Sequence, residues 1–175
     1  MADNPLTPDK TINYRVYKDG SNLIGIATVD LPDLSYMTDT ISGAGIAGEI
    51  ETPVLGHFQA MSLTLNWRTV NDNAITLLKA EGTTLTLRAA QQNLDNAQNK
   101  LTPVGLKITV KTLPKTSGLG SMEVGATSST TTELEISYIK IENNDTQILE
   151  IDKLNFICKI GDTDTLADVR SLLGI

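Results

Sequence analysis

Two long stretches of alternating apolar and polar residues lie near the carboxyl end of this 175-residue chain. They cover residues 131–141 and 146–158, and the sequence Glu142-Asn143-Asn144-Asp145 between them is typical of a turn. Strict alternation predicts half-buried β-strands, because successive side chains of a strand point to opposite faces. We therefore expect a hairpin here, and a strand pair of this length needs cover on both faces.

The apolar phase of this hairpin changes at the same height in both strands. A turn centred at Asn144 pairs Leu134 with Leu154 on one face. The same register pairs Ile139 with Leu149 on the other face. A sheet buried on one face cannot do this, because the side-chain period is two. Either a β-bulge re-aims the strands, or the hairpin buries one face at its base and the other at its tip, as it would against a neighbouring subunit.

A second segment with clean alternation spans residues 58–67. Met61, Leu63, Leu65 and Trp67 share one face, whereas the other face carries small, uncharged polar side chains. The apolar face belongs in the core. Trp67 is therefore predicted to be buried.

Over the whole chain the pattern predicts a mainly β protein of about eight strands with one short internal helix and a C-terminal helix. Residues 1–10 are expected to form a flexible arm, and residues 11–175 a single domain. The remaining strands are expected at 12–17, 23–31, 49–54, 84–90 and 104–112, the helices at 71–82 and 164–173, and loops at 40–48, 91–103 and 113–129. Residues 49–54 and 58–67 are expected to pair as a hairpin.

Both expected helices have residues that can cap their ends. Asn71 or Asp72 can cap the first helix, and Gly82 can end it. Asp162 or Thr163 can cap the second. The apolar stripe of the second helix, which is expected to pack on the sheet, consists of Leu166, Val169, Leu172 and Leu173.

A net charge of −7 and a pI of about 4.6 restrict the partners of this chain. A clamp on the phosphate backbone of nucleic acid needs a basic surface, which the composition does not suggest. An acidic surface still suits a conduit, because repulsion keeps a polyanion from adhering.

The cellular compartment is inferred from the single cysteine and from the lack of targeting and membrane-spanning signals. Cys158 is the sole cysteine, so no intrachain disulfide can form, and its apolar alternating neighbours predict a buried thiol. The first residues lack the features of a signal peptide. No apolar stretch approaches membrane-spanning length. We expect the chain to fold in a reducing cytoplasm.

Sequence signals for chemistry are weak throughout. Gly43-x-Gly45-x-x-Gly48 has the spacing of a dinucleotide fingerprint, but the strand before it is only weakly apolar, and Glu49-Ile-Glu-Thr-Pro follows where a helix should begin. His57 is the only histidine and lies in a predicted turn. One histidine and one cysteine cannot make a usual transition-metal site. We therefore predict no enzyme activity, no cofactor and no metal.

Five segments, in order, resemble the major tail tube proteins of phages with contractile tails and the related tubes of R-type bacteriocins. They span nearly the whole chain. The segments are Ile12-Asn-Tyr-Arg-Val-Tyr-Lys-Asp-Gly, Thr28-Val-Asp-Leu-Pro32, Ser42-Gly-Ala-Gly-Ile-Ala-Gly-Glu-Ile continuing to Trp67, Glu133-Leu-Glu-Ile-Ser-Tyr-Ile-Lys-Ile with its return Ile148-Leu-Glu-Ile-Asp-Lys-Leu-Asn, and Ala167-Asp-Val-Arg-Ser-Leu-Leu-Gly-Ile.

The resemblance implies a structural role and a fold, a small β-sandwich or split barrel. Subunits of that family form hexameric rings that stack into a tube, and strands of all subunits join into one continuous β-barrel around a channel. The implied partners are the tail sheath, the baseplate and the tail-terminator proteins. The monomer is not expected to insert into a membrane. In a phage, DNA passes through the channel without specific binding, and in a bacteriocin, ions do. The implied location is the virion tail or bacteriocin particle.

The polar faces of the alternating strands are the expected channel lining under this resemblance. Lys153 falls opposite Glu135 in the register above and can neutralise it. The predicted channel-lining residues are Ser62, Thr64, Asn66, Lys107, Lys111, Glu133 and Glu135. The predicted ring-stacking loop contains Ser42, Gly43, Gly45, Ile46, Gly48 and Glu49.

Two alternatives stay open at the level of sequence. The first is a ring-forming component or effector carrier of a related contractile injection system, whose pore would hold cargo. The second is a small enzyme or ligand-binding sandwich, which would have to show a bound metabolite.

Overall fold

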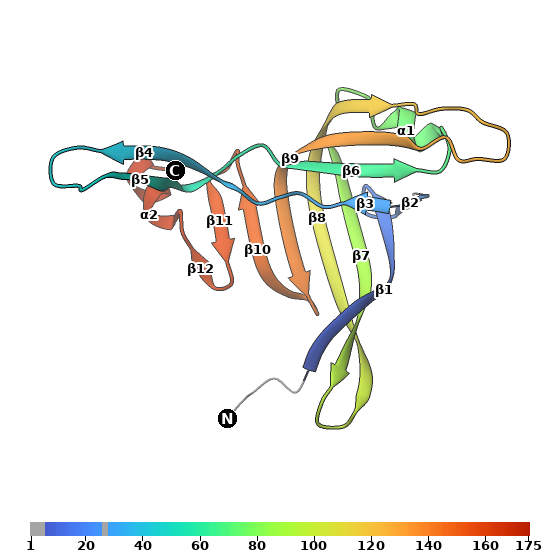
Figure 1. Ribbon diagram of the computed structural model, residues 1–175, viewed down its shortest axis with the longest axis horizontal. Helices are drawn as coiled ribbons and strands as arrows, with labels where there is room; N and C mark the ends of the chain where they lie inside the picture. Colours follow the sequence, from blue (N-terminus) through green and yellow to red (C-terminus); the bar gives the residue numbers. More distant parts are fainter. Residues whose placement is uncertain (1–5, 26–27) are drawn as a thin grey trace.

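The computed structural model of the chain describes residues 6–25 and 28–175. It confirms a mainly β fold of antiparallel strands with two short helices (Figure 1). One ten-stranded sheet has the order β12-β11-β10-β9-β8-β7-β1-β2, with β6 also paired to β9 and β3 paired to β6. Strands β4 and β5 form a separate two-stranded sheet.

Twelve strands are present in the described residues, more than the eight expected. They are β1 (Leu6–Lys18), β2 (Asn22–Ile24), β3 (Thr28–Asp30), β4 (Tyr36–Ser42), β5 (Glu49–Phe58), β6 (Ser62–Trp67), β7 (Thr83–Asp95), β8 (Lys100–Gly118), β9 (Thr130–Asn143), β10 (Thr146–Asp152), β11 (Ile157–Ile160) and β12 (Thr163–Asp164); the helices are α1 (Asp72–Thr76) and α2 (Ala167–Leu173).

The core is built from the apolar faces of the alternating strands. Leu63, Leu65 and Trp67 of β6 are buried, as predicted, and face buried side chains of β7, β8 and β9. Trp67 is 1% exposed, and its Nε1 donates to Thr132 Oγ1 at 3.0 Å. Cys158 is also buried, as predicted. The opposite side of the main sheet, which we call the outward face, carries the polar residues of these strands.

Strand β9 contains a bulge that explains the phase change seen in the sequence. Lys111 of β8 pairs with Tyr138 and Thr112 with Ile136, so Ser137 is an extra residue. Below the bulge β9 pairs with β10, and above it β9 pairs with β6. Because the bulge resets the alternation, Ile136 and Ile139 both enter one core. This confirms the first of the two alternatives considered.

The expected register of the last hairpin is wrong. Ile139 pairs with Ile151 instead of Leu149, and Leu154 does not pair with Leu134. Strand β10 ends at Asp152 because its carboxylate accepts hydrogen bonds from the backbone N–H groups of Leu154 and Asn155, which turns the chain. The chain then returns as β11 beside β10.

Strands β7 and β8 extend far beyond their expected ends, so the predicted loop at 91–103 is wrong. Their ladder continues to the pair of Asp95 with Lys100, and Asp95 Oδ1 accepts from the N–H groups of Ala97 and Gln98 in the turn. Strand β8 also runs to Gly118, which shortens the second predicted loop to 119–129.

The predicted hairpin of 49–54 with 58–67 is also wrong. Strand β5 runs through Gly56 to Phe58 and pairs with β4, a strand that was expected to be partly loop. Tyr36 stacks on Phe58 with ring centroids 4.5 Å apart and fixes the base of this hairpin. Residues 43–48 form its tip (Figure 1).

Two predictions for the amino-terminal part of the chain are also wrong. Residues 6–10 were expected in a flexible arm but begin β1, and they pair with the far end of β7. The rest of that arm lies outside the described residues. The single strand expected at 23–31 is divided: β2 pairs with β1, whereas β3 pairs with β6.

The helices are shorter than expected. Asn71 caps α1, since its Oδ1 accepts from the Ala74 N–H, but the helix ends at Thr76, well before Gly82. Helix α2 has Leu166 at its N-cap position and no side-chain cap, so the predicted caps Asp162 and Thr163 are wrong. Leu166 is buried, whereas Leu172 and Leu173 are exposed, so only the first part of the predicted stripe packs.

Candidate assembly and channel surfaces

The outward face of β6 and β9 brings together most of the predicted channel-lining residues. Ser62 lies opposite Glu135, and Thr64 lies opposite Glu133. Directly opposite residues of an antiparallel pair point to the same side. Their common face is outward, because the alternating residues Leu63 and Leu134 are buried.

Lysines neutralise both glutamates of this cluster. Lys115 Nζ lies 2.6 Å from Glu133 Oε1 and also donates to Ser62 Oγ at 3.1 Å. Lys153 Nζ lies 3.2 Å from Glu135 Oε1, the contact predicted from sequence. Hydrogen bonds from Lys115, and then from Ser62, hold the pKa of Glu133 below its ordinary value. The pair is therefore present at neutral pH and is lost as the pH falls through that lowered pKa.

Lys115 is the residue of this cluster that sequence reasoning missed. It fell in a segment expected to be loop, whereas it is the extra residue of a bulge in β8 between Pro114 and Thr116. No signal at Lys115 itself could have placed it there. The charge alternation of Glu133 and Glu135 could have suggested that cations lie opposite them.

Asn66 lies further along β6 on the same face. Its Nδ2 donates to Asp30 Oδ2 of β3 at 3.0 Å. The bond ties the two strands together and occupies the amide. Asn66 is therefore on the predicted face, but with a structural hydrogen bond of its own.

Lys107 and Lys111 lie on the outward face of β8, below the β9 bulge. Lys107 Nζ is 2.8 Å from Glu142 Oε2, and Lys140 Nζ is 3.1 Å from the other oxygen of that carboxylate. Lys111 Nζ lies 5.1 Å from the centroid of the Tyr138 ring, within range of a cation–π contact. The two lysines are thus separate from the Ser62 cluster but share its sheet face.

Tyr138 provides a measurable property of this face. Burial, and then its 3.0 Å hydrogen bond to Glu150 Oε1, raise the pKa of Tyr138 to about 12. Since the folded-state pKa lies above the ordinary value of 10.0, this contribution to stability is complete below pH 10 and is lost as the pH rises through about 12.

We therefore predict that Tyr138 ionises well above the ordinary range for a tyrosine. The difference in phenolate absorbance between the wild type and Tyr138→Phe should show a single step near pH 12. A difference step at the ordinary value for tyrosine would contradict the buried hydrogen bond.

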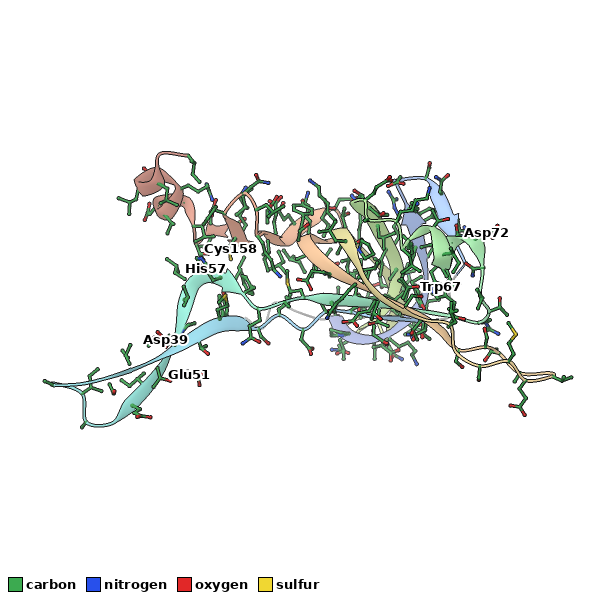
Figure 2. The ribbon with its side chains drawn as sticks, turned by 90° about the horizontal axis from the view of Figure 1, so that it is seen from above. Asp39, Glu51, His57, Trp67, Asp72 and Cys158 are labelled. Carbon is green, nitrogen blue, oxygen red and sulfur yellow. The ribbon has the colours of Figure 1, made fainter. Side chains whose placement is uncertain are left out.

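The predicted ring-stacking residues lie away from the outward face, at and beside the tip of the β4–β5 hairpin. Ser42 ends β4, Glu49 begins β5, and Gly43, Gly45, Ile46 and Gly48 lie between them at the hairpin tip. The hairpin projects from the body of the molecule, as the positions of Asp39 and Glu51 show in Figure 2. Ile41 and Ile50 are exposed although they lie directly opposite each other. The distal hairpin therefore lacks cover from its own chain.

The described residues contain little that suggests chemistry. No group of three His, Cys, Asp or Glu side chains within them is placed to hold a metal ion. The His57 ring packs edge-on to Phe156 at 6.4 Å, and its Nδ1 lies 2.9 Å from the Leu55 carbonyl oxygen. In the same residues no helix is long and apolar enough to cross a membrane.

Comparisons with known proteins concern the fold and the family of the chain. Among solved structures, the chain is similar to the sheath/tube terminator of the extracellular contractile injection system PVC, with 16% identity and a TM-score of 0.54, covering 78% of this chain and 97% of that one. It is also similar to the tube terminating cap of the anti-feeding prophage, with 14% identity and a TM-score of 0.51, covering 74% of this chain and 87% of that one. At these identities the likeness concerns the fold.

The sequence itself gives the family. No curated protein matches it. However, the family model described as phage tail tube protein FII matches residues 8–174, almost the whole chain. The resemblance noted from the sequence is confirmed, and the chain belongs to the family of phage tail tube proteins of the FII type.

Proposed function

We propose that this chain is the structural subunit of the inner tube of a contractile tail. Copies form hexameric rings, the rings stack, and the stack encloses a channel that carries DNA in a phage or ions in a bacteriocin. The tail sheath, the baseplate and the tail terminator bind this tube. The protein performs no catalysis, and its place is the tail of the particle.

The observation that carries this proposal is the hairpin of β4 and β5. Isolated two-stranded hairpins are marginally stable in water. Here residues 38–42 and 49–51 are exposed on both faces, and both strands have a free edge within the described part of the chain. Exposed edges and exposed apolar residues such as Ile41 and Ile50 favour contact with another chain.

The outward face of the main sheet supports a channel role. Within this face lysines are paired with glutamates, Lys115 with Glu133, Lys153 with Glu135 and Lys107 with Glu142. A lysine paired in this way is less available to bind a passing polyanion. A conduit fits this better than a cargo carrier, whose pore would need to hold its load.

The residues proposed to line the channel are those predicted from sequence. On β6 they are Ser62, Thr64 and Asn66; on β8, Lys107 and Lys111; on β9, Glu133 and Glu135. The stacking contacts are proposed to come from the hairpin tip between Ser42 and Glu49.

Electron microscopy of the purified protein tests the function. We expect concentrated wild-type protein in negative stain to show rings or hollow tubes of constant diameter. Sedimentation velocity of the same sample should show large assemblies that dissociate on dilution. A protein that stays monomeric at high concentration in both measurements would contradict the proposal.

A further inference from the structure

Among the described residues, the β4–β5 hairpin shares no backbone ladder with the main sheet, and its two strands pair only with each other. The direction of the hairpin must therefore be set at its base, where β5 ends at Phe58. In Figure 2, His57 lies at that base beside the carboxyl-terminal strands, whereas Asp39 and Glu51 lie out along the hairpin. The contacts that hold the base thus decide where the tip points.

Two side chains of the carboxyl-terminal segment contact this base. Leu166 is buried, and its side chain lies so close to Gly56 of β5 that a Cβ added to Gly56 would come 2.5 Å from Leu166 Cδ2. The Phe156 ring meets the His57 ring edge-on, with centroids 6.4 Å apart. Gly56 and His57 are consecutive residues of β5, so both contacts act on one point of this strand.

Phe156 needs support to hold its ring in this position. Its φ of +53° is a left-handed conformation, which is strained for a bulky side chain. Strained conformations persist only where the surrounding contacts hold them in place. The carbonyl oxygen of Phe156 accepts a hydrogen bond from Arg170 Nη1 at 2.8 Å. Arg170 of α2 therefore supports the strained residue whose ring contacts β5.

Arg170 also fixes the position of Leu166. Its Nη2 lies 2.7 Å from Asp164 Oδ2, and its Nη1 donates to Oδ1 of the same carboxylate at 3.3 Å. Asp164 Oδ1 in turn accepts from the backbone N–H of Leu166 at 3.2 Å. Hydrogen bonds from Arg170 hold the pKa of Asp164 below its ordinary value, so the carboxylate is ionised at neutral pH. Because a guanidinium and a carboxylate that bind at two points have a defined geometry, the pair fixes the turn that carries Leu166.

We infer that Arg170 sets the direction of the β4–β5 hairpin. Its guanidinium group holds Phe156 through the carbonyl oxygen and Leu166 through Asp164. Those two side chains contact the base of β5. Arg170 acts through these neighbours, so it is a positioning residue of the assembly surface. This role rests on the proposed function and deepens it by naming what keeps the hairpin in place to bind the next copy.

A hairpin of fixed direction binds its partner more tightly than one that changes direction. The apparent affinity of a binding surface falls with the fraction of molecules that hold it in the competent arrangement. If loss of Arg170 leaves about one tenth of the hairpins in that arrangement, the critical concentration for tube assembly rises about tenfold. The hairpin keeps its own ladder and the stack of Tyr36 on Phe58, so it changes direction without unfolding.

Pulsed electron paramagnetic resonance on the monomer measures this direction. Spin labels on Thr40→Cys of β4 and Lys111→Cys of β8, with Cys158→Ala in every sample, report the distance between the hairpin and the main sheet. We expect one narrow distance distribution with Arg170 present and a broad one with Arg170→Ala. Arg170→Lys should lie between them, because it keeps the charge and loses the two-point geometry. Lys159→Ala is the matched control, which removes the cation of a neighbouring ion pair and should leave the distribution narrow.

A second variant disturbs the same contact from the side of β5. In Gly56→Ala the new Cβ would collide with the Leu166 side chain. Gly161→Ala is its control, because φ there is +58°, close to the +66° of Gly56, and in the described part of the chain a Cβ would meet no atom within 4 Å. Gly56→Ala should broaden the distribution as Arg170→Ala does, and Gly161→Ala should leave it narrow.

Assembly of the same variants without labels is read from pelleting and negative stain, after circular dichroism has shown that each is folded. If Arg170→Ala does not fold, Gly56→Ala decides. Narrow distributions in the folded variants would overturn the positioning role, and so would broad ones in both controls or in the protein that keeps Arg170. Broad distributions with assembly at the wild-type concentration would overturn the role of Arg170 in assembly.

The outcomes separate this inference from the proposed function. A wild type that forms no tubes would overturn the proposed function. The distance measurement is made on the monomer, so it would still decide whether Arg170 directs the hairpin.

Discussion

Replacement of Trp67 by alanine should remove a large part of the stability of the domain and lower its melting temperature steeply. Removing a buried tryptophan costs about 3–5 kcal/mol through lost burial and the cavity left behind. The free energy of unfolding of a domain is only about 5–15 kcal/mol. Trp67 is fully buried at the end of β6, and its indole N–H is bonded to Thr132 of β9. Losing the side chain would also leave the Thr132 hydroxyl without this partner.

Thermal melting followed by circular dichroism measures this effect. Trp67→Phe is the matched control, because it keeps an aromatic ring in the site and loses the hydrogen bond to Thr132. We expect Trp67→Phe to melt between the wild type and Trp67→Ala. Equal melting temperatures for the wild type and Trp67→Ala would show that the tryptophan is not part of the core.

Gly45→Pro should leave the monomer folded and abolish tube formation. Gly45 has a φ of +95° at the hairpin tip, a conformation that proline cannot adopt because its ring fixes φ near −65°. A side chain at Gly45 would meet no atom of its own chain, so the body of the domain should not be affected. The tip must change shape, and the stacking contact proposed for residues 42–49 would be lost.

Gly125→Pro is the control for this substitution. Gly125 also has a positive φ of +83° and open space around it, but it lies in the loop between β8 and β9. Both variants should melt within a few degrees of the wild type, and only Gly45→Pro should fail to form tubes in negative stain. Tubes of normal length from Gly45→Pro would show that the hairpin tip does not mediate stacking.

The alternating strands were predictable because each buries one face. In β6 and β9 the core demands an apolar residue at every second position, so Leu63, Leu65 and Leu134 reveal both the strand and its orientation. The phase change between Ile136 and Ile139 revealed that something resets the alternation. It did not reveal that Ser137 is the extra residue, because the choice depends on the partner strand.

Strand β4 and the far ends of β7 and β8 escaped prediction for the opposite reason. Residues 38–42 of β4 are exposed, and residues 91–95 of β7 and 100–103 of β8 are exposed or half-buried, so no apolar alternation is required there. These segments are held by backbone ladders, and their sequences resemble polar loops. The Lys115–Glu133 ion pair could not be predicted either, because the bulge that positions Lys115 depends on the register of β8 against β9. The proposed assembly surfaces come largely from such segments.

A cryo-electron microscopy map of the assembled tube, at a resolution that shows side chains, tests the central claim most directly. That claim is that the sheets of one chain are completed by identical neighbours around a hollow axis. We predict that the hairpin of β4 and β5 contacts another copy and that Ser62, Glu133 and Glu135 face the lumen. A map in which the hairpin folds back on its own subunit, or in which these residues face the exterior, would contradict the account.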